Sequence, residues 1–164
     1  MRSQSPIVTA GRLRAAGPED ATLLWDWAND SDTRAQAFRS EPISWESHRA
    51  WYAEKLADAR TFIGIFESSE GCPLGQIRFD EGPEGVEADV AIAPSWRGKG
   101  LAQGLVRHGL AVAARCWPVG TIVVAKVLTG NQCSYRLFTR CGFVDKGIQT
   151  SHGKTYAQLE GVLT

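Results

Sequence analysis

Three short runs rich in apolar residues follow one another in the middle of the chain. They cover residues 61–66, 74–79 and 86–92, and polar or glycine-rich turns separate them. Runs of this length are typical of strands, and short connections favour antiparallel neighbours. The pattern therefore predicts an antiparallel meander of three strands.

Helical spacing replaces strand spacing on both sides of this meander. Pro18 and the two acids behind it suit the first turn of a helix, and Ser44 is a favoured N-cap for another. The expected elements, in chain order, are a strand over 12–16, helices from 18, over 33–38 and over 45–57, the three strands, a helix from 101, a strand over 121–127, a helix from 131 and strands over 143–148 and 156–159. This order predicts a mixed α/β (α+β) domain with an antiparallel start.

A glycine-rich loop joins the third strand of the meander to the next helix. It reads Arg97-Gly98-Lys99-Gly100-Leu101-Ala102. The first amides of a helix lack intrahelical partners and lie at the positive end of its dipole, and glycine lets the backbone approach a ligand closely. The loop therefore predicts a site for an anion, best a pyrophosphate. It is not a nucleotide-hydrolase P-loop, because Gly100 follows Lys99 where serine or threonine belongs, and a Rossmann fingerprint would follow the first strand.

Composition narrows the class of protein. The 164 residues fit one domain, 1–164, in which we expect residues 1–10 to be a loose leader. Eighteen basic and eighteen acidic residues give a net charge of zero, which argues against nucleic-acid and membrane-surface partners. No apolar run could span a bilayer, no secretory signal is recognisable, and the four cysteines lack zinc-site spacing. We expect a cytoplasmic protein without a metal, and a homodimer remains an option.

The loop and its surroundings resemble those of the GCN5-related N-acetyltransferase (GNAT) superfamily. The family's loop has the form Arg/Gln-x-x-Gly-x-Gly/Ala, and it is followed by a strand, a helix opened by asparagine and a Gly-Phe step. The matching residues are Arg97, Gly98, Lys99, Gly100, Leu101, Ala102, Asn131, Ser134, Gly142 and Phe143. The resemblance implies the GNAT fold, a mixed sheet of about seven strands whose fourth and fifth strands splay apart between flanking helices.

The resemblance also implies acetyl-CoA as the cofactor. In the family the loop from Arg97 to Ala102 holds the pyrophosphate, and the strand residues Val90, Ala91 and Ile92 pair with the pantetheine arm. Asn131 and Ser134 would lie near the thiol, although an asparagine at this place can equally serve as a helix cap.

Transfer of an acetyl group to an amine needs an oxyanion donor, a base and an acid for the leaving sulfur. The family's usual oxyanion donor corresponds to the backbone amide of Val90 or Ile92. Glu87 and Asp89 alternate on one strand and share a face, and Asp80 ends the strand before, so each is a candidate base. The family's acid is often a tyrosine at the place of Phe138. Phe138 cannot donate a proton, which leaves Tyr135 or water.

The first third of the chain resembles acetyltransferases that act on nucleotide-linked 4-amino-4,6-dideoxy sugars of the pseudaminic-acid pathway. Aromatic and basic side chains there suit a nucleotide sugar. The candidate acceptor-binding residues are Trp27, Asn29, Arg34, Phe38, Ser40 and Arg78. A protein N-terminal acetyltransferase of the ribosomal-protein type, and an acyl-CoA-binding module without turnover, remain alternatives.

Overall fold

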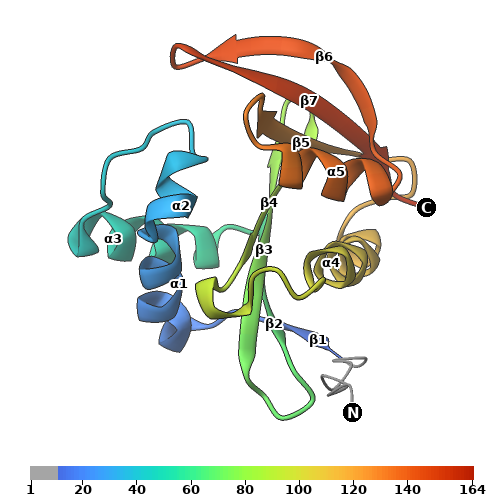
Figure 1. Ribbon diagram of the computed structural model, residues 1–164. Coiled ribbons are helices and arrows are strands. Elements are labelled where there is room, and N and C mark those ends of the chain that lie inside the picture. Colours follow the sequence, from blue (N-terminus) through green and yellow to red (C-terminus); the bar gives the residue numbers. More distant parts are fainter. Residues whose placement is uncertain (1–10) are drawn as a thin grey trace, which may run out of the picture.

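A single mixed sheet of seven strands forms the centre of the protein (Figure 1). The computed structural model describes residues 11–164; the proposed leader, 1–10, lies outside the described residues. The strands are β1 (Arg12–Ala15), β2 (Thr61–Glu67), β3 (Pro73–Gly82), β4 (Gly85–Ile92), β5 (Ile122–Leu128), β6 (Val144–Ser151) and β7 (Lys154–Val162). Their order across the sheet is β1-β2-β3-β4-β5-β7-β6. The expected GNAT architecture with an antiparallel start is confirmed.

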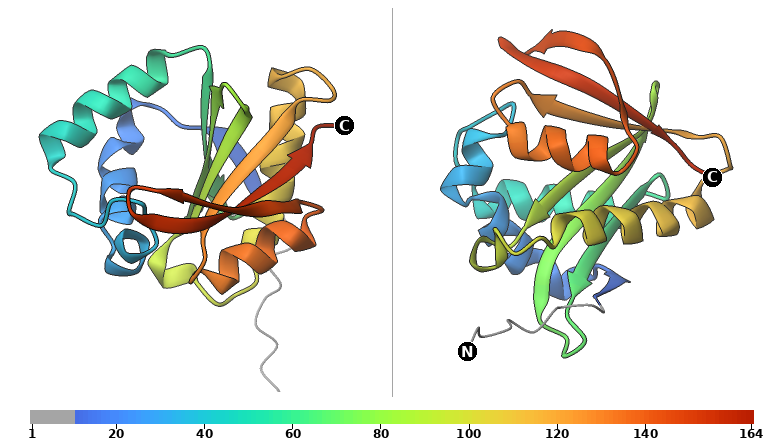
Figure 2. Two further views of the ribbon diagram at one scale, coloured as in Figure 1. Left: turned by 90° about the horizontal axis from the view of Figure 1, so that it is seen from above. Right: turned by 45° about the vertical axis from the view of Figure 1, so that its right-hand side comes forward.

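Helices cover both faces of this sheet. The first three helices, α1 (Ala21–Ala28), α2 (Ser31–Ala35) and α3 (Trp45–Ala57), lie on one side, and α4 (Ala102–Cys116) and α5 (Gln132–Arg140) lie on the other (Figures 1 and 2). Two 3-10 turns, η1 (Pro18–Asp20) and η2 (Pro94–Trp96), precede α1 and the glycine loop. The two faces have separate apolar clusters, one under α4 and α5 and a smaller one under α1 and α3.

Pairing between β4 and β5 is the one parallel contact among the described strands, and it is short. Only Val86 with Val123 and Glu87 with Val124 form it. Beyond these pairs β4 continues to Ile92 and β5 to Leu128 without hydrogen bonds to each other, whereas β5 pairs with β7 along its whole length. The expected splay of the two strands is therefore present, and it opens toward their C-terminal ends (Figure 2).

Glycines allow close approach at two places in this framework. Gly85 has φ of +133°, and a Cβ there would lie 2.4 Å from the carbonyl oxygen of Ile122. Gly109 lies on α4, and a Cβ there would lie 2.4 Å from Cδ1 of Ile77 on β3. Gly85 thus brings β4 against β5 at the closed end of the splay, and Gly109 lets α4 pack directly on the sheet.

Some element boundaries differ from those the sequence predicts. The second helix spans 31–35 instead of 33–38, because the Asp30 side chain accepts from the amide of Thr33 and so caps the helix earlier. The last strand spans 154–162 instead of 156–159, because it pairs on both sides, with β5 and β6. Strand boundaries set by cross-strand pairing are not visible in local sequence.

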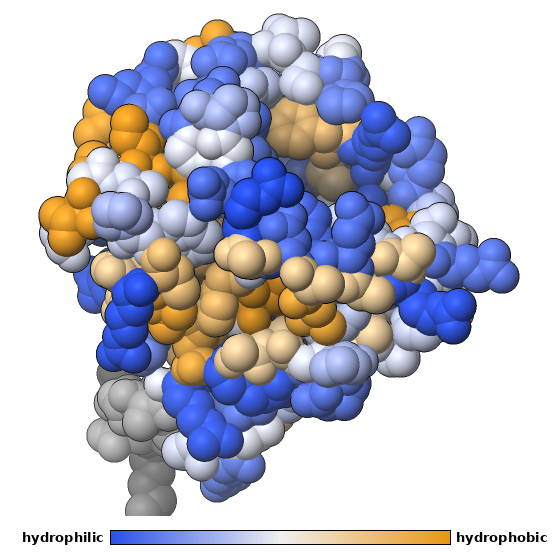
Figure 3. Space-filling view, turned by 180° about the vertical axis from the view of Figure 1, so that it is seen from behind, coloured by the Kyte–Doolittle hydropathy of each residue, from blue (hydrophilic) through white to orange (hydrophobic). Residues whose placement is uncertain are grey.

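The surface of the molecule is not uniformly polar. On the face opposite to that of Figure 1, apolar side chains form a band across the middle, with hydrophilic ones above and below it (Figure 3). Apolar atoms contribute over half of a typical protein surface, so this band by itself implies no partner.

We expect Gly85→Ala to destabilise the fold strongly. The new Cβ would meet a backbone oxygen that cannot rotate away, and φ at this position is unfavourable for alanine. The free energy of unfolding should fall by about 3–5 kcal/mol, measured by urea denaturation. Gly153→Ala is the matched control, since φ there is +73° with open space around it, and it should cost only about 1–2 kcal/mol. Equal losses in the two variants would contradict a role for the contact with Ile122.

Candidate active site

The glycine loop has the geometry of an anion cradle. Gly98 and Gly100 both have φ of +73°, and a Cβ at either would meet no atom within 4 Å. The left-handed φ favours glycine, and the empty surroundings leave the loop amides accessible. The first amides of α4, a helix of 15 residues, follow directly. The loop, from Gly98 to Ala102, therefore fits the pyrophosphate of a coenzyme A.

The edge of β4 that faces β5 lacks a strand partner beyond Glu87. The amide of Ala93 donates to the carbonyl of Leu74 on β3 at 2.9 Å. In an antiparallel ladder alternate residues point their N–H and C=O groups to the same side, so the groups of Ile92 and Val90 point away from β3. They face the open side of the splay, where an extended chain can pair with them.

The side chain of Arg97 contacts α2 and the residue before it. Its guanidinium lies 2.8 Å from the carboxylate of Asp30 and 3.4 Å from that of Asp32, and it donates to the hydroxyl of Thr33 at 3.1 Å. Its hydrogen bond holds the pKa of Asp30 below the ordinary value. The Arg97 side chain is thus committed to α2, and the exposed Lys99 remains as the loop's other cation.

Polar side chains gather on the sheet face that α1 and α3 cover, across β3, β4, β5 and β7. We call this set the polar network; it consists of Gln76, Arg78, Asp80, Glu87, Asp89, Lys126 and Gln158. Gln76 donates to Asp89 at 3.0 Å, and Lys126 lies 3.5 Å from Glu87. The side chains of Glu87 and Asp89 keep 50% and 55% exposure. Both carboxylates are therefore accessible to an incoming amine.

Asp80 is less accessible than the other two candidate bases. It accepts from Lys55 at 2.8 Å, from Thr61 at 2.9 Å and from Arg78 at 2.6 Å. Burial alone would raise the pKa of Asp80, but the charge of Arg78 and these hydrogen bonds outweigh it and lower that pKa. A carboxylate that already accepts three hydrogen bonds and has a lowered pKa is a poor proton acceptor.

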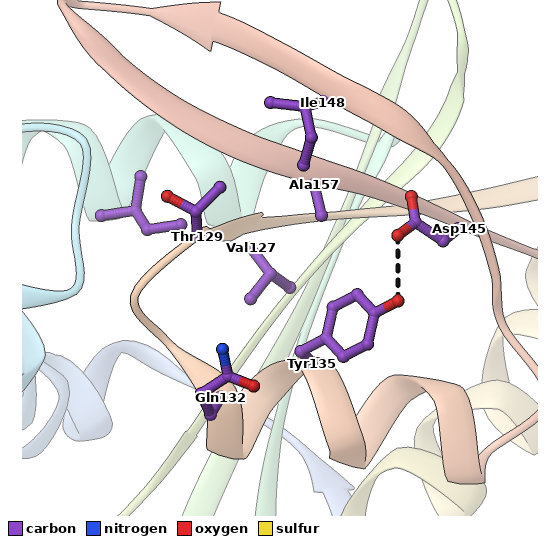
Figure 4. Close-up of a pocket in the computed structure, with 8 residues that line it drawn as sticks. Val127, Thr129, Gln132, Tyr135, Asp145, Ile148 and Ala157 are labelled. Carbon is purple, nitrogen blue, oxygen red and sulfur yellow. Dashed lines mark hydrogen bonds between the residues drawn. The ribbon is translucent and has the colours of Figure 1, made fainter.

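Tyr135 lies in a pocket of about 260 Å³ between α5 and the β5-β7-β6 part of the sheet (Figure 4). Its hydroxyl donates to the carboxylate of Asp145 at 2.9 Å, which raises the pKa of Tyr135. The lining residues come from β5, the turn after it, α5, β6 and β7, and none from β4. The structure therefore places Tyr135 apart from the unpaired edge of β4.

Two other α5 positions take structural roles. Asn131 accepts from the amide of Ser134 at 3.2 Å and so caps α5. Phe138, at the place where a proton-donating tyrosine was sought, is 4% exposed and packs on Phe143 at 5.0 Å between ring centroids. Ser134 is half-buried beside the cap.

Three of the residues expected to bind the acceptor are structural. Trp27 is 9% exposed and belongs to the apolar cluster under α1 and α3. The Asn29 side chain exchanges two hydrogen bonds of 2.8 Å with the backbone of Ile43. Arg34 donates to the carbonyls of Ala28 and Arg39. Each of these side chains has partners within the fold, and acceptor binding by them stays a prediction.

The other three expected acceptor residues are not part of the apolar cluster under α1 and α3. Ser40 lies on the surface. Phe38 packs edge-on against Tyr156 of β7, with ring centroids 5.2 Å apart. Arg78 belongs to the polar network and stacks its guanidinium 5.0 Å from the ring centroid of Trp51.

Sequence reasoning missed Lys126 and Gln158. Both lie on the face of the polar network, Lys126 beside Glu87 and Gln158 hydrogen-bonded to Gln149 and Glu160. A lysine inside the apolar run 121–127 was the available signal, because a charged residue in a buried strand requires a polar partner.

Comparison with known proteins identifies the family to which the chain belongs. Residues 12–144 match the model of the acetyltransferase (GNAT) domain. Among solved structures, a spermidine N-acetyltransferase from Vibrio cholerae with CoA and spermine is 19% identical with a TM-score of 0.82, covering 93% of this chain and 95% of that one. An aminoglycoside acetyltransferase with coenzyme A is 20% identical, with a TM-score of 0.79 and coverage of 93% and 95%. No curated protein sequence matches the chain.

The chain therefore belongs to the GNAT acetyltransferase family. It is an acetyl-CoA-dependent N-acetyltransferase, and the cradle and the unpaired edge of β4 fit that cofactor.

Within residues 11–164 no group of potential metal ligands gathers. None of the helices in that range has the length and apolar character needed to cross a bilayer.

We expect Gly100→Ala to weaken CoA binding. Alanine resists φ of +73°, so the loop would shift and the amides would lose their alignment. Affinity should fall about ten-fold in calorimetric titration with CoA. Gly71→Ala is the matched control, because it introduces alanine at a similar left-handed φ, +83°, in the turn between β2 and β3. It should change the affinity for CoA less than about two-fold. Equal CoA affinities in the two variants would contradict a role for the loop in cofactor binding.

Proposed function

We propose that this enzyme acetylates the primary amine of a nucleotide-linked amino sugar. The observation that carries the proposal is the position of Asp89. It lies two residues beyond the last β4–β5 pair, on the accessible face of the polar network and next to Val90, whose amide faces the open side of the splay. A base and an oxyanion donor thus adjoin the same stretch of unpaired backbone.

In this mechanism the protein mainly positions the two substrates and polarises the thioester carbonyl. Bound acetyl-CoA supplies the acetyl thioester. The loop amides hold the pyrophosphate, and the amide of Val90 or Ile92 donates to the carbonyl oxygen. Asp89 accepts the proton that the amine loses as nitrogen bonds to carbon. Because Phe138 has no hydroxyl and Tyr135 is bound to Asp145, water protonates the departing thiolate, a tolerable leaving group at a thiol pKa near ~8.5.

Arg78 and Trp51 support a nucleotide-linked acceptor. The half-exposed indole of Trp51 and the guanidinium above it form a flat surface of the kind on which bases stack. Phe38 and Tyr156 add a second aromatic pair near Lys126. These groups support the sugar nucleotide proposed from the sequence resemblance.

A polyamine or aminoglycoside is the second candidate. The structures compared above include enzymes named for those substrates. The polar network holds three carboxylates against two cations, and Arg34 is engaged by backbone carbonyls. Accessible carboxylates favour a polycation over a diphosphate.

Thiol release from acetyl-CoA separates these candidates. The panel consists of a UDP-4-amino-4,6-dideoxy sugar, spermidine, kanamycin and a peptide with a free N-terminus. We expect the highest kcat/KM for the UDP-amino sugar, with transfer confirmed by mass. Turnover of spermidine or kanamycin alone would replace the first candidate by the second, and turnover of the peptide alone would overturn both.

Asp89→Asn should lower kcat/KM by about 10²–10⁴ on the preferred amine, since a lost general base costs that much. Asp80→Asn is the matched control, and it should affect stability more than rate. A larger rate loss in Asp80→Asn than in Asp89→Asn would contradict our assignment of the base.

A further inference from the structure

Residues 30–40, which we call the strap, contact both the glycine loop after β4 and the turn between β6 and β7. The strap comprises α2 and the chain after it, and it runs toward the β6–β7 turn (Figures 1 and 2). Its two ends contact opposite sides of the β4–β5 splay, as the contacts below show.

The first contact fastens α2 to the cofactor loop. Arg97, the residue before Gly98, pairs with Asp30 at 2.8 Å and donates to Thr33 at 3.1 Å. Asp30 also caps α2 by accepting from the amide of Thr33. One carboxylate therefore both starts the helix and ties it to the loop that follows β4.

The second contact fastens the strap to β7 and its turn. Lys154 donates to the carbonyl of Ala37 at 2.9 Å, and Phe38 packs on Tyr156. Arg39 lies 3.4 Å from the ring nitrogen of His152. Tyr156 is opposite Leu128, the last residue of β5, so this contact lies at the open end of the splay.

Apart from these two contacts, the strap is held mainly by Arg34, which donates to the carbonyls of Ala28 and Arg39. No residue from 28 to 47 is buried. Segments with few buried apolar contacts open locally at low free energy. Polar contacts at the two ends, with the Phe38–Tyr156 pair, therefore decide how well the strap is ordered.

We propose that Arg97 is a positioning residue that transmits occupancy of the cofactor loop to the strap. An ordered loop holds Arg97 in place, Arg97 holds Asp30, and the strap closes over the polar network on which the acceptor binds. The order of the strap thereby depends on whether the cofactor is bound. The inference rests on cofactor binding at the loop and not on which amine is the acceptor.

Asp30→Asn tests the contact without disturbing the helix cap, because asparagine caps a helix as well as aspartate. It keeps Arg97 and removes the charge of its closer partner, while Asp32 stays at 3.4 Å. Asp26→Asn is the matched control, since it makes the same change of charge at an exposed position of α1 that does not contact Arg97. Hydrogen exchange of backbone amides in residues 30–40 is measured for each protein with and without CoA.

In the wild type we expect CoA to slow exchange in the strap about ten-fold. In Asp30→Asn exchange should already be fast, and CoA should slow it less than about two-fold, while the affinity for CoA changes less than about three-fold. Asp26→Asn should behave as the wild type. With an amine that is turned over, Asp30→Asn should raise the KM for that amine and leave kcat nearly unchanged.

Two results would overturn the proposal. One is wild-type CoA protection of the strap in Asp30→Asn. The other is unchanged strap exchange in Arg97→Gln together with a large loss of CoA affinity, which would make Arg97 a phosphate ligand instead. If CoA does not bind the wild type at all, cofactor binding at the loop itself fails, a result that calorimetry reports separately from strap exchange.

Discussion

The short parallel contact between β4 and β5 is the constraint on which the site depends. Two residue pairs join the halves of the sheet, and Gly85 permits the close approach at that end because any Cβ would strike the carbonyl of Ile122. Beyond the pairs, β4 keeps its ladder with β3 and β5 keeps its ladder with β7. Backbone groups of β4 are thereby left for a ligand, without loss of the pairing that stabilises each half.

The candidate cofactor site and the polar network are assembled in different ways. The glycine loop and the amides of Val90 and Ile92 come from one continuous segment, so their relative placement follows from local geometry. The polar network instead combines β3, β4, β5 and β7. Its charges are mutually compensated, as in Lys126 with Glu87 and Arg78 with Asp80. Such compensation keeps ionised groups near an apolar core at tolerable cost.

The sequence predicted what is encoded locally. Apolar periodicity located nearly every strand, and the loop motif indicated a candidate cofactor cradle, because both depend on neighbours in the chain. The placement of side chains from distant segments was not predictable in this way. Arg97 pairs with Asp30, which lies 67 positions earlier, and Arg34 donates to backbone carbonyls; neither contact has a signal in the local sequence. Trp27 is buried, and composition alone does not tell a core tryptophan from an exposed one.

The absence of buried residues from 28 to 47 also bears on how this enzyme could change its substrate. Exposed positions tolerate substitution within about 0.5 kcal/mol, so mutations there do not consume the small stability margin of a domain. New acceptor contacts can accumulate in this stretch while the two apolar clusters and the cofactor loop stay intact. The exposed positions of this stretch are therefore the natural target for a directed library.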